Sequence, residues 1–91
     1  MRIDKYLKLT RIIKRRQISK EIVDQGRVEV NGRVVKPAFT IKGGDQILMR
    51  FTRNIIEVEV LEIDEKLIKK NPDGAYKIVS ERVNETKSRQ E

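Results

Sequence analysis

The chain has 91 residues, a length that allows one small domain and leaves no room for a second. It contains no cysteine and no histidine, which excludes disulfides, thiolate metal sites and enzymes that depend on a thiol nucleophile or a histidine base. The net charge is +7, and the sequence has neither the apolar core of a signal peptide nor a run long enough to span a membrane, so a cytoplasmic protein is expected.

Two short helices are predicted in the first 26 residues. In the first helix, Asp4 can act as the N-cap. The second helix has an apolar stripe in which Ser19 is the small central residue, so a neighbouring helix can approach closely there. Gly26 follows the last periodic residues and is expected to end this helix at the C′ position.

The rest of the chain has the alternation of β-strands. Asn31-Gly32 predicts a two-residue hairpin, because both central positions of a type I′ turn need a positive φ. Strands are predicted over residues 46–51 and 55–63. After a turn at 71–74, residues 75–81 are predicted to form a last short strand, with a helical turn as the alternative. The tail from residue 84 is polar and is predicted to be disordered. The expected class is α+β, with two short N-terminal helices packed on a small, curved, mostly antiparallel sheet.

Basic residues are concentrated at the start of the chain. Residues 1–20 carry eight lysines and arginines against one acid, a net charge of +7, whereas residues 21–54 carry +2 and residues 55–91 carry −2. A localised basic field of this kind indicates a polyanion-binding surface. Arg2 and Arg16 stand near the starts of the two predicted helices, where the positive helix end favours an anion. Arg15 beside Arg16 adds a second guanidinium group that can bind phosphate bidentately.

The scarcity of aromatic residues indicates which kind of nucleic acid is bound. A binder of open single strands usually has several stacking rings, so few rings among many cations favour backbone and shape recognition of structured RNA. The predicted RNA-binding residues are Arg2, Lys5, Arg11, Lys14, Arg15, Arg16, Lys20, Arg27 and Lys36.

Little in the sequence favours catalysis. Glu57 and Glu59 fall on one face of a predicted strand, where a solvated surface explains them better than an acid/base pair does. Residues 42–45, Lys-Gly-Gly-Asp, form a turn rather than a phosphate-binding loop, because no Gly-Lys-Ser follows. No metal-ligand spacing is present, so no catalytic residue, metal or cofactor is expected. A small RNA-modifying enzyme is the contrasting hypothesis, and it requires turnover by the purified protein.

The order of these motifs resembles the S-four RNA-binding domain. The residues that match its pattern are Arg2, Asp4, Leu7, Arg16, Ser19, Gly26, Val28, Val30, Asn31 and Gly32. Arg15 and Ser19 depart from the commonest pattern, since many members have Ser or Thr at the first position and Ala at the second. The resemblance implies the alpha-L fold, with an S-four-type domain over residues 1–63 and a short C-terminal extension over residues 64–91.

A stand-alone domain of this kind resembles the heat-shock protein fifteen family, and most closely its short Gram-positive branch, the RqcP type of ribosome-associated quality-control proteins. The resemblance implies a non-catalytic factor that binds the large ribosomal subunit carrying peptidyl-tRNA. Its implied partners are the rRNA of that subunit, the peptidyl-site tRNA and a factor that adds tails to stalled nascent chains, and it is expected to be a monomer without membrane contact. A ribosome-assembly or RNA-chaperone factor is the alternative.

Overall fold

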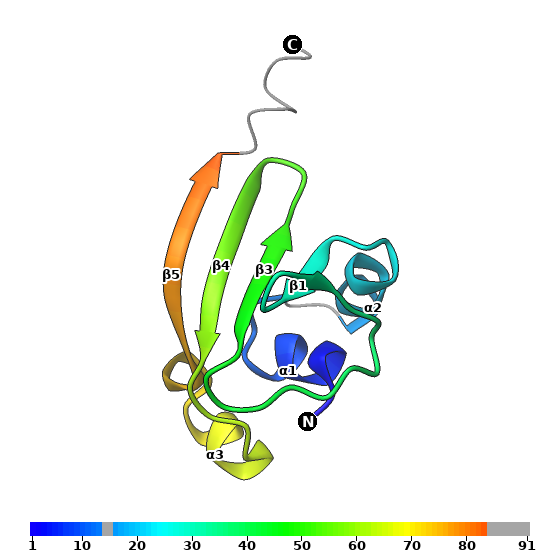
Figure 1. Cartoon of the computed structure of the whole chain (residues 1–91). Coiled ribbons are helices and arrows are strands. Elements are labelled where there is room, and N and C mark those ends of the chain that lie inside the picture. Colours follow the sequence, from blue (N-terminus) through cyan, green and yellow to red (C-terminus); the bar gives the residue numbers. More distant parts are fainter. Residues whose placement is uncertain (14–15, 84–91) are drawn as a thin grey trace.

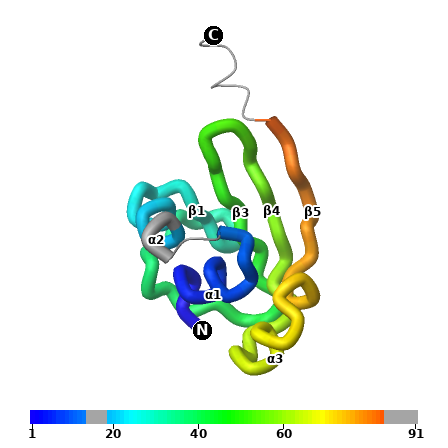
Figure 2. The backbone as a smooth tube through the Cα atoms, turned by 180° about the vertical axis from the view of Figure 1, so that it is seen from behind, coloured from blue at the N-terminus to red at the C-terminus, as the bar shows by residue number. Residues whose placement is uncertain are grey.

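The computed structural model describes residues 1–13 and 16–83, and of residues 16–18 it describes the backbone alone. Within these ranges the elements are, in chain order, α1 (Ile3–Leu9), α2 (Arg16–Asp24), β1 (Val28–Val30), β2 (Arg33–Val34), β3 (Gln46–Arg50), β4 (Asn54–Val60), α3 (Glu65–Lys70), a 3₁₀ helix (Pro72–Ala75) and β5 (Tyr76–Val83). The strands form one antiparallel sheet in the order β2-β1-β3-β4-β5. The helices α1 and α2 lie together on one side of it, and β3, β4 and β5 extend beyond them (Figure 1, Figure 2). The predicted α+β class is confirmed.

Alternation along the strands separates apolar from acidic side chains, because successive residues of a strand face opposite sides of the sheet. The inward positions join one core with the helices, and they include Val28, Val30, Ile47, Met49, Val58 and Val60. Glu29, Glu57 and Glu59 alternate with these inward residues along β1 and β4, and they face the other side of the sheet. Three carboxylates of the sheet are therefore kept on the face away from α1 and α2.

The contact between α1 and α2 is made at Ser19. This residue is fully buried, and its hydroxyl donates a hydrogen bond to the backbone carbonyl of Asp4 at 2.7 Å. A larger side chain would occupy the space that lets the two helices meet. The predicted close approach at Ser19 is confirmed.

The N-cap prediction for Asp4 is wrong. Helix α1 begins two residues earlier, with Arg2 at the N-cap position, and the Asp4 carboxylate accepts the Lys5 N–H at 2.8 Å from within the first turn. A side-chain cap is not needed here, because the loop after β2 supplies backbone carbonyls to the first N–H groups of the helix.

Gly26 ends α2 as predicted. It has a φ of +75°, and its N–H donates to the Val23 carbonyl at 3.0 Å. The next N–H, that of Arg27, donates to the Ile22 carbonyl at 3.2 Å. These two bonds form a Schellman motif, which satisfies the last carbonyls of the helix and turns the chain into β1.

The hairpin turn is also confirmed. Asn31 and Gly32 have φ values of 52° and 87°, the positive pair that a type I′ turn needs. The Asn31 amide also reaches the next turn of the chain: its Nδ2 donates to Asp45 at 3.1 Å, and its Oδ1 accepts the Gln46 N–H at 3.0 Å. The side chain of Asn31 thus holds the hairpin against the start of β3.

The region between β4 and β5 differs from the sequence prediction. Strand β4 ends at Val60 rather than at residue 63, and β3 ends at Arg50 rather than at 51, each where the chain leaves the sheet. Helix α3, which the alternation pattern did not indicate, follows β4. Its N-cap is Asp64, whose carboxylate accepts the N–H groups of Lys66 and Leu67 at 2.9 and 3.3 Å. The turn expected at 71–74 contributes the first residues of the 3₁₀ helix.

The last strand completes the sheet. It runs from Tyr76 to Val83, longer than the predicted 75–81, and pairs along the whole of β4. The Tyr6 hydroxyl of α1 donates to the Ala75 carbonyl at 2.6 Å, which ties the first helix to this part of the chain. The division after residue 63 stays a prediction, and the predicted disordered tail lies outside the described residues. No helix in the described ranges is long and apolar enough to cross a membrane.

Candidate nucleic-acid interface

Three segments of the chain meet at the beginning of α1. The N–H groups of Ile3 and Asp4 donate to the carbonyls of Phe39 and Pro37, at 2.8 and 3.3 Å, so the loop after β2 lies against this end of the helix. Ser19 reaches the same place from α2 through its bond to the Asp4 carbonyl. The surface here is therefore formed by the start of α1, the middle of α2 and residues 36–39.

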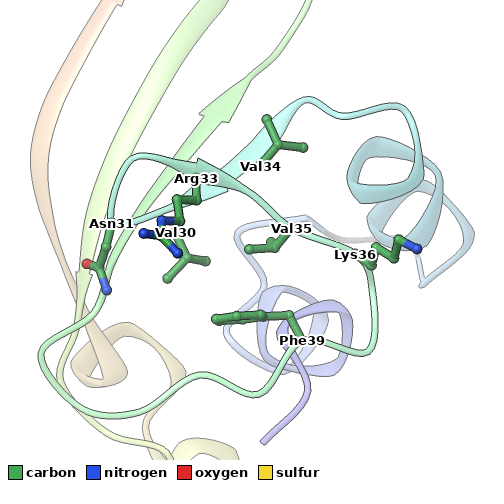
Figure 3. Close-up of a pocket in the computed structure, with 7 residues that line it drawn as sticks. All are labelled: Val30, Asn31, Arg33, Val34, Val35, Lys36 and Phe39. Atoms are coloured by element: carbon green, nitrogen blue, oxygen red, sulfur yellow. The ribbon is translucent and has the colours of Figure 1, made fainter.

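Each of these segments contributes an exposed cation to this surface. They are Arg2, Lys20 and Lys36. Lys20 and Lys36 form no ion pair with any residue in the described part of the chain. The Lys36 side chain extends toward α2 (Figure 3).

Arg2 is partly neutralised by its neighbour. Its Nε and Nη2 donate to the two carboxylate oxygens of Asp4 at 3.1 and 3.0 Å, while 55% of its side chain stays exposed. An exposed ion pair of this kind is worth only about 0–1 kcal/mol, so an RNA phosphate can replace Asp4 at little cost.

The N-terminus of α1 does not supply the free N–H groups that the sequence argument assumed. The first three N–H groups of the helix are already bound, two by loop carbonyls and that of Lys5 by the Asp4 carboxylate. A phosphate near Arg2 would therefore be held by side chains rather than by the helix end. This corrects the expectation that the helix terminus itself takes part at Arg2.

The other predicted residues are spread over the helical half. Lys5 pairs with Glu65 of α3 at 2.6 Å, and Lys69 pairs with the same carboxylate at 3.1 Å. Hydrogen bonds from Lys5 first, and then from Lys69, hold the pKa of Glu65 below its ordinary value. Arg11 is exposed just beyond α1 with a φ of 63°, and Arg27 is exposed between Gly26 and β1. Among the described residues neither arginine has an ion pair.

Three of the predicted residues, Lys14, Arg15 and Arg16, are consecutive in the sequence. Arg16 is the first residue of α2, as expected, but its side chain is among those that the structure does not describe. Lys14 and Arg15 lie outside the described residues. The role of this cluster therefore stays a prediction. In the described ranges, no group of three carboxylates is arranged to hold a metal ion.

Comparison with known proteins identifies the family. Residues 1–47, more than half of the chain, match the S4 domain. A protein of Streptococcus pneumoniae named RQC P-site tRNA stabilizing factor is 46% identical over 81 residues, which are 89% of this chain and 92% of that protein. The chain belongs to the family of RQC P-site tRNA stabilizing factors, and it contains an S4 domain. A protein with the same name from Bacillus subtilis is 40% identical and covers 89% of this chain and 94% of its own length.

The structure of a relative agrees on the fold. A trimeric structure of Heat Shock Protein 15 from Vibrio cholerae superimposes with a TM-score of 0.77 over 99% of this chain and 91% of that one, at 23% identity. The predicted S-four domain is confirmed, and the chain shares the fold of Heat Shock Protein 15. The family is one of RNA-binding proteins of ribosome quality control rather than of enzymes, as the sequence also predicted.

Two exposed residues next to the interface were not among the predicted RNA-binding residues. Arg33 opens β2 and, within the described part of the chain, has no ion pair. Phe39 is 41% exposed although it is aromatic. The sequence signal was weak, since charge clustering selects the start of the chain and a single phenylalanine is normally read as core. Both lie three residues from Lys36 in the sequence, and the folded hairpin shows that Arg33 and Phe39 line one groove.

Proposed function

We propose that this chain binds the large ribosomal subunit when peptidyl-tRNA is still on it, contacts both the rRNA and the P-site tRNA, and thereby supports the tailing of stalled nascent chains. It acts without catalysis, as a monomer, in the cytoplasm. The binding surface comprises the predicted cations on the two helices together with Arg27 and Lys36.

One observation from the molecule carries this proposal. Residues from α1, α2 and the loop after β2 converge on a single surface with exposed cations, while Glu29, Glu57 and Glu59 lie on the opposite side of the sheet. Glu29 is neutralised there by an ion pair with Arg50, so the proposal rests on the exposed cations of the helical side. A basic surface of this kind attracts and orients a polyanion before contact. The chain is 46% and 40% identical, over 89% of its length, to two proteins named RQC P-site tRNA stabilizing factor. This similarity supports P-site tRNA as part of the polyanion.

Arg16 is the first residue to test. We expect Arg16→Ala to weaken binding to large subunits carrying peptidyl-tRNA by about 10- to 100-fold, because a charge-assisted contact is worth roughly 1.5–3 kcal/mol. Arg2→Ala should have a smaller effect, since Asp4 already neutralises part of its charge. Lysine at position 16 should restore binding only in part, because a point charge lacks the bidentate fork. Co-sedimentation at fixed salt measures these affinities, and circular dichroism checks folding.

The matched control is Arg53→Ala. Arg53 is exposed, lies in the turn between β3 and β4, and has no ion pair in the described part of the chain, so the charge change is the same at a distant place. If Arg16→Ala binds as the wild type does, the RNA-binding surface must lie elsewhere, and the hairpin would be the next region to test. Association with precursor particles instead of subunits carrying peptidyl-tRNA would favour the ribosome-assembly alternative.

A further inference from the structure

A groove lies between the β1–β2 hairpin and the loop that follows β2. It has a volume of about 690 Å³, within the range of about 300–1,000 Å³ that small-ligand sites occupy. One wall is the hairpin and the other is the loop that carries Phe39. Arg33, Val35 and Phe39 reach into the space between them, and Lys36 stands at the end nearest α2 (Figure 3).

Both walls of the groove are fixed by hydrogen bonds. The Phe39 carbonyl accepts the Ile3 N–H of α1 at 2.8 Å, and the Phe39 N–H donates to the Lys36 carbonyl at 3.0 Å. On the other wall, the Asn31 side chain is bonded to Asp45 and Gln46. The groove is thus formed before any ligand arrives, which reduces the ordering cost of binding.

The side chains that line the groove indicate which class of ligand it can bind. The floor is apolar, with a phenylalanine ring that is 41% exposed, and no carboxylate lines the groove. Arg33 and Lys36 add two positive charges that no described residue neutralises. A flat apolar ring beside cations suits a ligand with a flat ring and a negative charge, which describes a nucleotide.

A peptide strand fits this place less well. Strand β2 is the edge of the sheet, but it has only two residues, Arg33 and Val34. An added strand needs a longer row of unpaired backbone groups to gain affinity from main-chain hydrogen bonds. The groove also adjoins the proposed RNA surface through Lys36, so an RNA that lies across α1 and α2 passes its entrance.

We infer that the groove takes one unstacked RNA nucleotide, with its base on the Phe39 ring and its phosphate at Arg33, while Lys36 at the other end of the groove meets a neighbouring phosphate of the same RNA. This inference rests on the proposed function, because the nucleotide belongs to the RNA that the helical surface binds. The base contact adds a stacking interaction to an interface that otherwise recognises backbone and shape.

The test uses the full chain and large ribosomal subunits with peptidyl-tRNA whose RNA contains 4-thiouridine. Irradiation at long wavelength should crosslink RNA to the peptide that contains Phe39. Phe39→Leu keeps an apolar side chain but removes the ring, and it should weaken binding roughly 5- to 150-fold, the effect of losing one stacked base. Phe39→Tyr should restore binding and the crosslink. Arg33→Ala should weaken binding as well.

Two variants serve as controls for these changes. Leu67→Ala removes an apolar side chain that is 49% exposed on α3, and Arg53→Ala removes a cation from the β3–β4 turn; both should bind as the wild type does. Unchanged affinity of Phe39→Leu, with the wild type binding and Arg16→Ala weakened, would overturn the groove inference and leave the proposed function intact. Failure of the wild type to bind the particle would overturn both.

Discussion

Gly26 fixes how α2 is presented relative to the hairpin. The Schellman motif requires a left-handed residue at this point, and the φ of Gly26 is +75°. Space is not the constraint, because a Cβ added here would meet only a methyl group of Val34, at 3.8 Å. The need for glycine is therefore conformational.

We expect Gly26→Val to lower the free energy of unfolding by about 1–3 kcal/mol, since a β-branched residue is strained at positive φ. For a domain of this size, each kcal/mol lowers Tm by about 4–8 °C. Gly43→Ala is the matched control. Gly43 does not have a positive φ and has no atom near an added Cβ, so stability should be unchanged or rise slightly. Equal melting temperatures for the Gly26 variant and the wild type would contradict this account of the helix end.

At the scale of elements, Tyr6 connects α1 to the C-terminal extension. Its side chain is fully buried, and its hydroxyl donates to the Ala75 carbonyl. That carbonyl also accepts the N–H groups of Leu61 and Glu62, at 2.9 and 3.1 Å. Burial raises the pKa of Tyr6 well above its ordinary value, and the neighbouring Tyr76 and Glu62 raise it further.

This pKa predicts a loss of stability at alkaline pH. Because folding raises the pKa, the folded state holds the phenolic proton more tightly than the unfolded chain, so this contribution is complete below about pH 10 and falls as the pH rises beyond it. Tyr6→Phe should remove that part of the pH dependence. At neutral pH the variant should lose only about 0.5–1.5 kcal/mol, since the Ala75 carbonyl keeps two donors. Urea unfolding of both proteins at pH 8 and pH 11 measures the difference, and parallel pH profiles would contradict it.

Elements that depend on neighbouring residues could be predicted from the sequence. Gly26 and Asn31-Gly32 act through their own backbone angles, and both turns were found where expected. Helix α3 was missed because the alternation of Glu57 and Glu59 was extended past Val60, although Asp64 is a recognisable N-cap. The end of β4 depends on the distant Ala75 carbonyl, which binds the N–H groups that would otherwise continue the strand.

For the candidate site, too, the sequence could predict local features but not contacts between distant residues. Charge clustering selected the helical half, and the three segments that carry the exposed Arg2, Lys20 and Lys36 meet at the start of α1. The groove that Arg33 and Phe39 line is formed within residues 30–39, but a single phenylalanine gives no sign of being exposed. Charge clustering could not show that Lys5 is paired with Glu65, sixty residues later in the chain. Such contacts arise from tertiary packing, for which local spacing contains no signal.

On the scale of the whole molecule, the concentration of cations at the start of the chain predicts strongly salt-dependent binding. Each phosphate that is neutralised releases counterions, and the slope of log affinity against log salt is about −0.9 per phosphate on a duplex. With a net charge of +7 in residues 1–20 and several exposed cations without an ion pair among the described residues, we expect roughly four to six contacts and a slope of about −3.6 to −5.4. Particle binding measured between low and physiological salt gives this slope, and a flat dependence would exclude the electrostatic surface.

Two double variants separate local contacts from total charge. Arg27→Ala with Lys36→Ala removes two cations near the helices, whereas Lys66→Ala with Lys77→Ala removes two from α3 and β5; all four residues are exposed. The net charge of both variants is +5, which is the native +7 less two. If individual phosphates are bound, the first variant should make the slope shallower by about 1.5–2, and the second should leave it nearly unchanged. Equal changes in both would mean that the RNA responds only to the overall field, because a specific contact is lost only where its cation is removed.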